Sequence, residues 1–187
     1  MKIGVLGAGN ISSMVAPTMA AMPQIECYAV SSRSLEKATA FAERFGFQKA
    51  YGSYEEMLQD PNVELVYVAT PHSHHFEHMM LCLKYGKPIL CEKAFTLNAA
   101  QAKQIQQAAA EKGIFVAEAI WPRYMPSRKI INDVLASGII GKPNTLTANL
   151  SYVIAHKQRI YDPNLAGGAL LDIGVYGVNF ALMHFGA

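Results

Sequence analysis

The chain has 187 residues and a formal net charge of +2, and 51% of its residues are hydrophobic while 16% are charged. This composition is typical of a compact globular protein and excludes a disordered chain. The charge is near neutral and the sequence has no lysine- or arginine-rich run, so nucleic acid is not an expected partner.

The cysteines and the apolar runs indicate the compartment. Cys27, Cys82 and Cys91 are an odd number without metal-ligand spacing, and each lies in an apolar stretch. They predict reduced thiols in a cytoplasmic protein. No apolar run reaches the ~20 residues of a membrane span, so a membrane is not an expected partner either.

Short apolar runs alternate with helical periods along the first 120 residues. They predict strands at 2–6, 25–31, 64–69, 87–91 and 114–118, with helices near 11–21, 34–45, 53–59, 74–85 and 98–112. Gly46 and Gly113 follow helices as expected C-caps, and Asn98 is an expected N-cap. Five successive β-α units predict a doubly wound, parallel α/β domain of the Rossmann type over residues 1–120.

The pattern changes after residue 120. Pro122 and Pro126 exclude a regular helix around them, and a helix is expected near 127–137. Alternating polar and apolar residues over 144–154 predict a half-exposed strand, and the apolar stretch 168–185 predicts a buried helix. Because one strand and two helices make a poor core, we expect 121–187 to be part of a second domain that is cut short.

The first strand is followed by a glycine-rich loop, Gly7-Ala8-Gly9-Asn10-Ile11-Ser12, that opens a helix. Gly7 allows the tight turn, and Gly9 lets the backbone approach a pyrophosphate. The helix start, with Asn10 and Ile11, presents N–H groups and a positive dipole end to that phosphate. The loop therefore predicts a dinucleotide site, although an ordinary strand–helix turn has similar spacing.

The end of the second strand indicates which dinucleotide binds. NAD-binding domains usually carry an acid there, whereas this chain has Ser31-Ser32-Arg33-Ser34. Hydroxyls and a guanidinium suit a 2′-phosphate, so Ser32 and Arg33 favour NADP, with NAD as the second choice. In the alternative interpretation, Arg33 is a solvated loop residue and Ser34 only caps the next helix.

Four histidines follow the third predicted strand: His72, His74, His75 and His78. His74 and His78 are four residues apart on a helix face, which is compatible with a metal site. The cluster lies at the mouth of the expected dinucleotide cleft, however, and no fourth ligand is evident. We therefore favour a turn that lines the cofactor and expect no metal.

Glu92-Lys93 follows strand 87–91 at its carboxyl end, where open α/β sheets bind ligands. Together with Gly7-x-Gly9, Thr70-Pro71-x-x-x-His75, Trp121-x-Arg123 and the run from Gly167 to Tyr176, it makes the chain similar to a known family. The chain resembles the glucose–fructose oxidoreductase/inositol dehydrogenase-like (Gfo/Idh/MocA) family over its whole length, and within it the dihydrodiol dehydrogenase branch. Ala94 replaces the family's usual proline, and His72 replaces a common asparagine.

The resemblance implies an NADP(H)-dependent oxidoreductase that transfers a hydride between nicotinamide and a secondary alcohol or carbonyl of a sugar, polyol or cyclic diol. It also implies a second domain of the α+β type with an antiparallel sheet, and a homodimer or higher oligomer for the full-length protein. It assigns cofactor contacts, beyond the residues of the two loops above, to Thr70, Pro71, His72, His75, Glu92, Lys93, Trp121 and Arg123.

Three residues are expected to carry the chemistry. Asp172 and Tyr176 are four apart and share one face of an otherwise apolar helix, and the resemblance places Lys93 with them beside the nicotinamide. Tyr176 is the expected acid/base, because the charge of Lys93 favours a phenolate. Asp172 would orient the substrate hydroxyl or Lys93, and Arg159 and Asp162 are further candidates for substrate contacts.

Two alternatives remain open from the sequence. The roles of Lys93 and Tyr176 in proton transfer are interchangeable at this level. Some members of the family sense or bind dinucleotides without turnover, and a fragment that binds cofactor would also lack activity. The presence of Lys93, Asp172 and Tyr176 together favours an enzyme.

Overall fold

The computed structural model describes residues 1–154 and 156–186. Its internal contacts divide the chain into two compact units, Met1–Glu118 and Ala119–Ala187.

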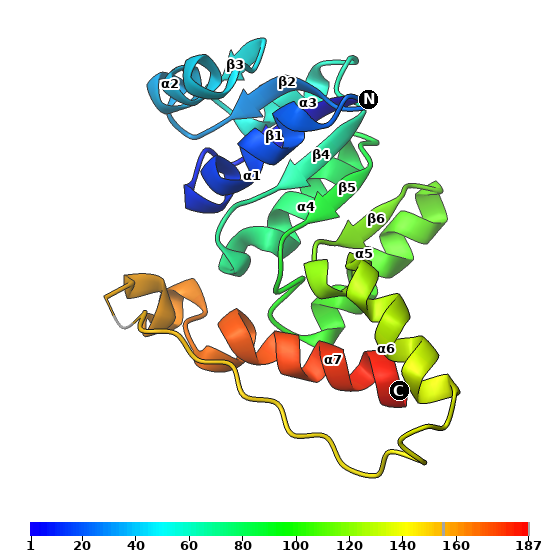
Figure 1. Cartoon of the computed structure of the whole chain (residues 1–187). Coiled ribbons are helices and arrows are strands. Elements are labelled where there is room, and N and C mark those ends of the chain that lie inside the picture. The colour runs from blue at the N-terminus through cyan, green and yellow to red at the C-terminus, as the bar shows by residue number, and fades with distance from the viewer. Residues whose placement is uncertain (155, 187) are drawn as a thin grey trace. The chain divides into compact units, whose positions relative to one another are not determined.

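The first unit is built on one sheet of six parallel strands (Figure 1). In spatial order these are β3 (Lys49–Tyr51), β2 (Glu26–Ser31), β1 (Lys2–Leu6), β4 (Leu65–Val68), β5 (Ile89–Cys91) and β6 (Val116–Glu118). The order runs outward from β1 in one direction and then from β4 in the other. The chain therefore has the topological switch point of a Rossmann-type fold between β1 and β4, where such sheets bind ligands.

Five α-helices connect these strands: α1 (Asn10–Ala21), α2 (Leu35–Phe45), α3 (Tyr54–Gln59), α4 (His75–Lys84) and α5 (Ala99–Lys112). α1 packs beside α2, and α4 packs beside α5. Because right-handed crossovers run in opposite directions from the switch point, these two pairs cover opposite faces of the sheet. The predicted strands and helices of this unit are confirmed within one to two residues at each end.

The helix ends follow from local sequence. Ser34 Oγ accepts a hydrogen bond from Lys37 N, and Asn98 Oδ1 accepts one from Gln101 N, so both side chains cap their helices. Gly46 and Gly113 end α2 and α5 with φ of 75° and 63°, in the left-handed region that glycine adopts without strain. The caps predicted at Asn98, Gly46 and Gly113 are confirmed.

Asp60, at the end of α3, links β2 and β3 through hydrogen bonds to its carboxylate. Its Oδ2 accepts hydrogen bonds from Tyr28 Oη (2.9 Å), Lys49 Nζ (2.8 Å) and Tyr51 Oη (2.6 Å), and Asn62 donates to Oδ1. Burial alone would raise the pKa of Asp60, but these donors outweigh it and hold the pKa well below its usual range. The carboxylate thus joins β2, β3 and the α3–β4 turn.

The second unit contains a 3-10 turn (Trp121–Tyr124), α6 (Pro126–Ala136), two further 3-10 turns (Gln158–Ile160 and Pro163–Leu165), a π-helical turn (Leu170–Gly174) and α7 (Val175–Phe185). Pro126 occupies the first turn of α6, where its missing N–H is tolerated. The predicted helix near 127–137 and the irregular turn before it are confirmed.

Two predictions for this unit are wrong. Residues 144–154 form extended chain rather than a strand. The antiparallel sheet that the resemblance implies for the second domain is not seen among the described residues of this unit, so that expectation stays a prediction. A strand needs a neighbour to pair its N–H and C=O groups, and the described part of this unit offers none. The helical stretch to Phe185 is also only partly buried: Asp172 and Asn179 are buried, whereas Leu170, Val178 and Leu182 are exposed.

Five of the six strands were predicted, and β3 was not. Its three residues, Lys49 to Tyr51, are too few to show a periodic pattern. Among the described residues, the helical stretch Pro163–Phe185 is long and apolar enough to cross a membrane by length and composition alone. This stretch was not predicted as a candidate span from the sequence, because polar residues interrupt its apolar run. A single stretch of this kind is weak evidence for a membrane span, and it contains the buried Asp172 and Asn179.

Candidate active site

The phosphate loop lies at the carboxyl end of β1. Gly7 has φ of +109°, and its N–H donates to Ser31 O at 2.9 Å. A Cβ at Gly7 would lie 3.0 Å from Thr70 Cγ2 and 3.2 Å from Ala69 backbone atoms. Only glycine therefore fits this turn. The Ser12 hydroxyl donates to Gly7 O from a buried position and fixes the loop against α1.

Gly9 has a different function from Gly7. It is the N-cap of α1 and makes no side-chain cap, and a Cβ there would approach only Ala69 O, at 3.9 Å. Asn10 is exposed and Ile11 is half-buried in the first helical turn. The absent side chain therefore leaves open space directly over a helix N-terminus, and this geometry fits a pyrophosphate.

The turn after β2 lies next to this loop in the sheet. Ser32 is buried and its N–H donates to Tyr51 O at 3.2 Å, which fixes the turn against β3. Arg33 is exposed, and Ser34 caps α2 as described. The guanidinium is thus carried on a fixed turn with solvent access, while the serine capping that the alternative interpretation invoked also occurs.

The turn after β4 holds Thr70, Pro71 and the histidines. Thr70 and His72 are buried, and Pro71 is exposed. His72 begins a 3-10 turn, His72–His74, that leads into α4. Among the described residues, no group of three or more His, Cys, Asp or Glu side chains is arranged to hold a metal.

His75 is fully buried at the start of α4. Its Nδ1 lies 2.8 Å from Ala94 O and its Nε2 lies 2.8 Å from Thr70 O. Burial lowers the pKa of His75, while the two carbonyl acceptors oppose that shift. The imidazole therefore links the turn after β4 to the loop after β5 from within the protein.

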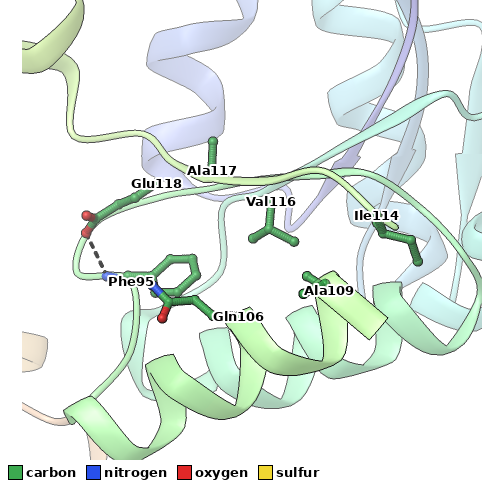
Figure 2. Close-up of a pocket in the computed structure, with 8 residues that line it drawn as sticks. Phe95, Gln106, Ala109, Ile114, Val116, Ala117 and Glu118 are labelled. Atoms are coloured by element: carbon green, nitrogen blue, oxygen red, sulfur yellow. Dashed lines mark hydrogen bonds between the residues drawn. The ribbon is translucent and has the colours of Figure 1, made fainter. Parts of the chain in front are cut away.

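The loop that carries Lys93 is fixed from two further sides. Tyr67 Oη donates to Glu92 Oε1 at 2.5 Å. Phe95 N donates to Glu118 Oε1 at 2.9 Å, as the dashed line in Figure 2 marks. Burial raises the pKa of Glu92, and the Tyr67 bond partly offsets the rise. Lys93 itself is half-buried. Side chains from β4, α4 and β6 thus preorganise the backbone on both sides of Lys93.

Figure 2 shows a hollow beside this loop, at the edge strand β6. Its lining residues come from the loop after β5, α5, the turn after α5 and β6: Phe95, Gln106, Ala109, Ala110, Ile114, Val116, Ala117 and Glu118. The hollow is lined mainly by apolar side chains, and Glu118, its one acidic residue, is bonded to Phe95 N. The hollow therefore lies beside the Lys93 loop, and the residues that line it include no pair of groups suited to acid–base or nucleophilic chemistry.

In the second unit, Trp121 and Tyr176 are in contact. Trp121 Nε1 donates to Tyr176 Oη at 3.1 Å, and the ring centroids are 5.8 Å apart. Asp172 is buried in the π-helical turn that precedes Tyr176. Tyr176 also borders a groove between the extended segment 148–150 and the helical stretch 169–180.

The remaining predicted residues of this unit have mainly local contacts. Arg123 is half-buried, and its carbonyl accepts a hydrogen bond from Arg128 at 3.2 Å. Asp162 caps a 3-10 turn by accepting from Asn164 N. The side chain of Arg159 lies outside the described residues.

Three residues near the expected site were not predicted for it. Tyr54 packs against His78, Tyr67 bonds Glu92, and Glu118 bonds Phe95. A tyrosine in the buried strand 64–69 is the one sequence signal among them, because a buried hydroxyl needs a partner. The other contacts join residues more than twenty positions apart, which no local pattern reveals.

Comparison with known proteins identifies the family. Residues 1–119 match the model of the GFO_IDH_MocA oxidoreductase family with an NAD-binding Rossmann fold, and residues 129–187 match the GFO/IDH/MocA C-terminal domain. The chain therefore belongs to this oxidoreductase family, and the resemblance drawn from its motifs is confirmed.

Individual relatives indicate the branch. The chain is 41% identical over its whole length to the trans-1,2-dihydrobenzene-1,2-diol dehydrogenase of Mus musculus and covers 57% of that protein. Over 94% of its length it is 42% identical to the D-xylose 1-dehydrogenase (NADP(+)) of Hypocrea jecorina, of which it covers 51%. The chain thus spans a little over half the length of the curated relatives that it matches.

A solved structure shows the same fold. A 3-ketoreductase from Actinomadura kijaniata, crystallised with TDP-benzene and NADP, superposes with a TM-score of 0.85 at 30% identity. The match covers all of this chain and 58% of that one. The similarity therefore extends over both units.

Proposed function

We propose that this chain is part of an NADP(H)-dependent oxidoreductase that transfers a hydride between nicotinamide and a secondary alcohol or carbonyl of a sugar, polyol or cyclic diol. One observation carries the proposal. The phosphate loop, the Ser32–Arg33 turn and Lys93 follow β1, β2 and β5, so all three lie at the carboxyl edge of one parallel sheet. In such sheets this edge binds dinucleotides.

The preference for NADP rests on Arg33. A guanidinium binds a phosphate through charge-assisted, often bidentate hydrogen bonds, whereas an acid at this place would repel it. The turn is fixed by the bond from Ser32 N to Tyr51 O, so Arg33 loses less freedom on binding. The NADP named with the xylose dehydrogenase and with the ketoreductase supports this choice.

The proposed catalytic residues act on the proton and on orientation. When bound, the nicotinamide supplies the hydride chemistry. Tyr176 Oη takes the proton of the substrate hydroxyl during oxidation and returns it during reduction. The Lys93 ammonium stabilises the negative charge on the phenolate oxygen of Tyr176, and Asp172 orients the substrate hydroxyl or Lys93. Thr70, Pro71, His72, Glu92, Trp121 and Arg123 are proposed to line the cofactor.

The test is a hydride-transfer assay that follows NADPH with trans-dihydrodiols, aldoses and polyols. We expect turnover with at least one of these classes. Tyr176→Phe is expected to lower kcat by about 10²–10⁴-fold, the usual contribution of a general acid or base, while the Kd for NADPH is unchanged. Tight NADPH binding without turnover on the whole panel would contradict the enzyme and favour a dinucleotide-sensing protein.

The variants Lys93→Met and Tyr176→Phe decide which of the two residues transfers the proton. If Tyr176 is the acid/base, Lys93→Met leaves a reduced rate with the pH limb displaced, because the phenol still titrates. If Lys93 transfers the proton, Lys93→Met removes that limb and Tyr176→Phe keeps it. The pH profiles of kcat in the two variants therefore assign the roles.

A further inference from the structure

Three aromatic side chains gather from the elements that follow β3 and β4: Tyr54 begins α3, His74 ends the 3-10 turn after β4, and His78 lies in α4. The Tyr54 and His78 rings meet edge to face with centroids 4.8 Å apart, and the His74 and His78 rings stack at 5.7 Å with an angle of 18°. All three side chains are half-buried. His78 is therefore the centre of this ring cluster.

On one side, the cluster adjoins the phosphate loop. Thr70 Oγ1 lies 2.9 Å from His78 Nδ1. The same Thr70 is the side chain that a Cβ at Gly7 would meet at 3.0 Å. A single threonine thus separates His78 from the backbone that is proposed to hold the pyrophosphate.

On the other side, the cluster adjoins the turn that carries Arg33. Ser32 N donates to Tyr51 O, and Tyr54 follows three residues later. A Cβ at Gly52, between them, would lie 3.2 Å from Leu35 Cβ, at the start of α2. His78 thus contacts Thr70, which adjoins the phosphate loop, and Tyr54, which follows the strand bonded to the Arg33 turn, and it feels the charge of Arg33.

The groups that face His78 keep it neutral in the free protein. Burial lowers the pKa of His78 to about 4, and His74, His75 and the positive charge of Arg33 act in the same direction. Tyr54 contributes its ring and feels the charge of Arg33 as well. None of these groups carries a negative charge, so an anion that binds beside Arg33 would reverse the balance.

We propose that His78 is a proton-linked part of the NADP site, taking up a proton when the 2′-phosphate binds beside Arg33. This inference rests on the proposed function only in requiring NADP to bind at the Arg33 turn. The step is a proton transfer: one N–H bond forms on the imidazole, and one bond to hydrogen breaks in the hydronium ion or buffer acid that gives the proton. The resulting imidazolium is a second cation for the phosphate, and NAD, without that phosphate, does not recruit it.

Linkage fixes the sign of the effect. Ligand binding that raises a pKa is accompanied by proton uptake and becomes tighter as pH falls. A phosphate monoester has its own pKa near ~6, and its selection as a dianion by Arg33 alone would release protons. Proton uptake on binding of NADP⁺ therefore indicates a site that includes His78, whereas proton release indicates a site in which Arg33 alone binds the phosphate.

The experiment is calorimetric titration of the whole chain with NADP⁺ and with NAD⁺, at about pH 6.5 in buffers of different ionisation enthalpy. We expect NADP⁺ to take up about 0.3–0.5 proton more than NAD⁺. His78→Gln is expected to abolish this extra uptake and leave either no difference or a net release with NADP⁺. His78→Phe, which keeps a ring against Tyr54, is expected to do the same if the glutamine variant folds poorly. His156→Gln, at an exposed histidine of the second unit, is the matched control.

The outcomes separate this inference from the proposed function. Tighter binding of NADP⁺ than NAD⁺ with equal proton uptake, or with an uptake that survives in both His78 variants, would overturn the role of His78 and leave the NADP site intact. Equal affinities for the two dinucleotides would overturn the NADP preference and the His78 inference with it. Turnover plays no part in either result.

Discussion

Trp121 Nε1 donates a hydrogen bond to Tyr176 Oη at 3.1 Å, across 55 positions of sequence. An indole N–H is a donor only, so the phenol oxygen accepts in this contact and its own proton takes no part in the bond. A donor to a phenol oxygen stabilises the phenolate more than the phenol. The contact therefore suits a tyrosine that gives and takes a proton in the proposed reaction.

Replacement of Trp121 by Phe removes this donor and keeps an aromatic ring. A hydrogen bond of this kind contributes about 0.5–1.5 kcal/mol, so kcat is expected to fall by roughly 2–10-fold. The pH limb that reports Tyr176 should move to higher pH, because the phenolate loses a donor. The pH profile of kcat measures both effects, with Tyr152→Phe, at an exposed tyrosine, as the control. A lower kcat with an unmoved pH limb would assign Trp121 to packing alone.

Gly7 and Gly9 provide a matched pair in one loop. Gly7→Ala places a side chain at φ +109° within 3.0 Å of Thr70, and we expect a loss of about 1–3 kcal/mol in the free energy of unfolding. Gly9→Ala meets nothing closer than 3.9 Å, so its unfolding free energy should change by less than about 0.5 kcal/mol. Its Cβ would instead obstruct a pyrophosphate, so the Kd for NADPH should rise at least about tenfold. Urea unfolding and fluorescence titration check the two readouts, and unchanged NADPH binding in Gly9→Ala would contradict the site.

Asp60 gives the fold an acid-sensitive component. Its pKa in the folded state lies well below the unfolded value near ~4, so its stabilising contribution is complete above that value and is lost as pH falls through the folded pKa. Asp60→Asn is expected to lower the unfolding free energy at neutral pH by about 2–4 kcal/mol and to flatten its decline below about pH 4. Denaturant unfolding at a series of pH values measures this.

The control for Asp60 is Asp133, whose ion pair with Lys129 at 2.7 Å is solvent-exposed. Surface pairs contribute about 0–1 kcal/mol, so Asp133→Asn should leave both the stability and its pH dependence nearly unchanged. Equal effects of the two substitutions would show that the buried network around Asp60 contributes no more to the free energy of unfolding than an exposed ion pair does.

Tyr67→Phe is expected to destabilise the fold most at neutral pH and least at low pH. The substitution leaves Glu92 buried without the donor from Tyr67, and costs about 1–3 kcal/mol at neutral pH. Burial already places the folded pKa of Glu92 above its unfolded value, and loss of the donor raises it further. The deficit relative to the unchanged protein should therefore shrink as pH falls and Glu92 becomes protonated. A deficit that grows toward low pH in denaturant unfolding would refute this account of Glu92.

The strands and helices of the first unit were predictable because each repeats a local pattern. The caps at Asn98 and Ser34 and the glycines at 46 and 113 mark helix ends through short-range hydrogen bonds and backbone angles. β3 was not predictable, since three residues carry no periodicity and its position depends on pairing with β2. The strand expected at 144–154 had the right alternation, but alternation specifies a strand only when a neighbouring strand is present.

Of the candidate site, residue types and order were accessible from the sequence, while contacts were not. The order of the phosphate loop, the Arg33 turn and Lys93 along the chain is enough to place them at one sheet edge once a parallel sheet is assumed. The environment of His78 required the structure: its spacing from His74 suggested a metal, whereas its actual neighbours are Thr70 and Tyr54. Such contacts depend on how helices lie over the sheet, which no single segment encodes.

The central claim, that an NADP molecule binds along the carboxyl edge of this sheet with its 2′-phosphate at Arg33, is tested most directly by fluorescence titration with NADPH and NADH. Charge-assisted bonds to the phosphate are worth about 1.5–3 kcal/mol, so the Kd for NADPH should be at least about tenfold lower than that for NADH. Arg33→Ala should bring the two constants together by weakening NADPH alone. Equal constants in the unchanged protein, or a preference that survives in Arg33→Ala, would contradict the account.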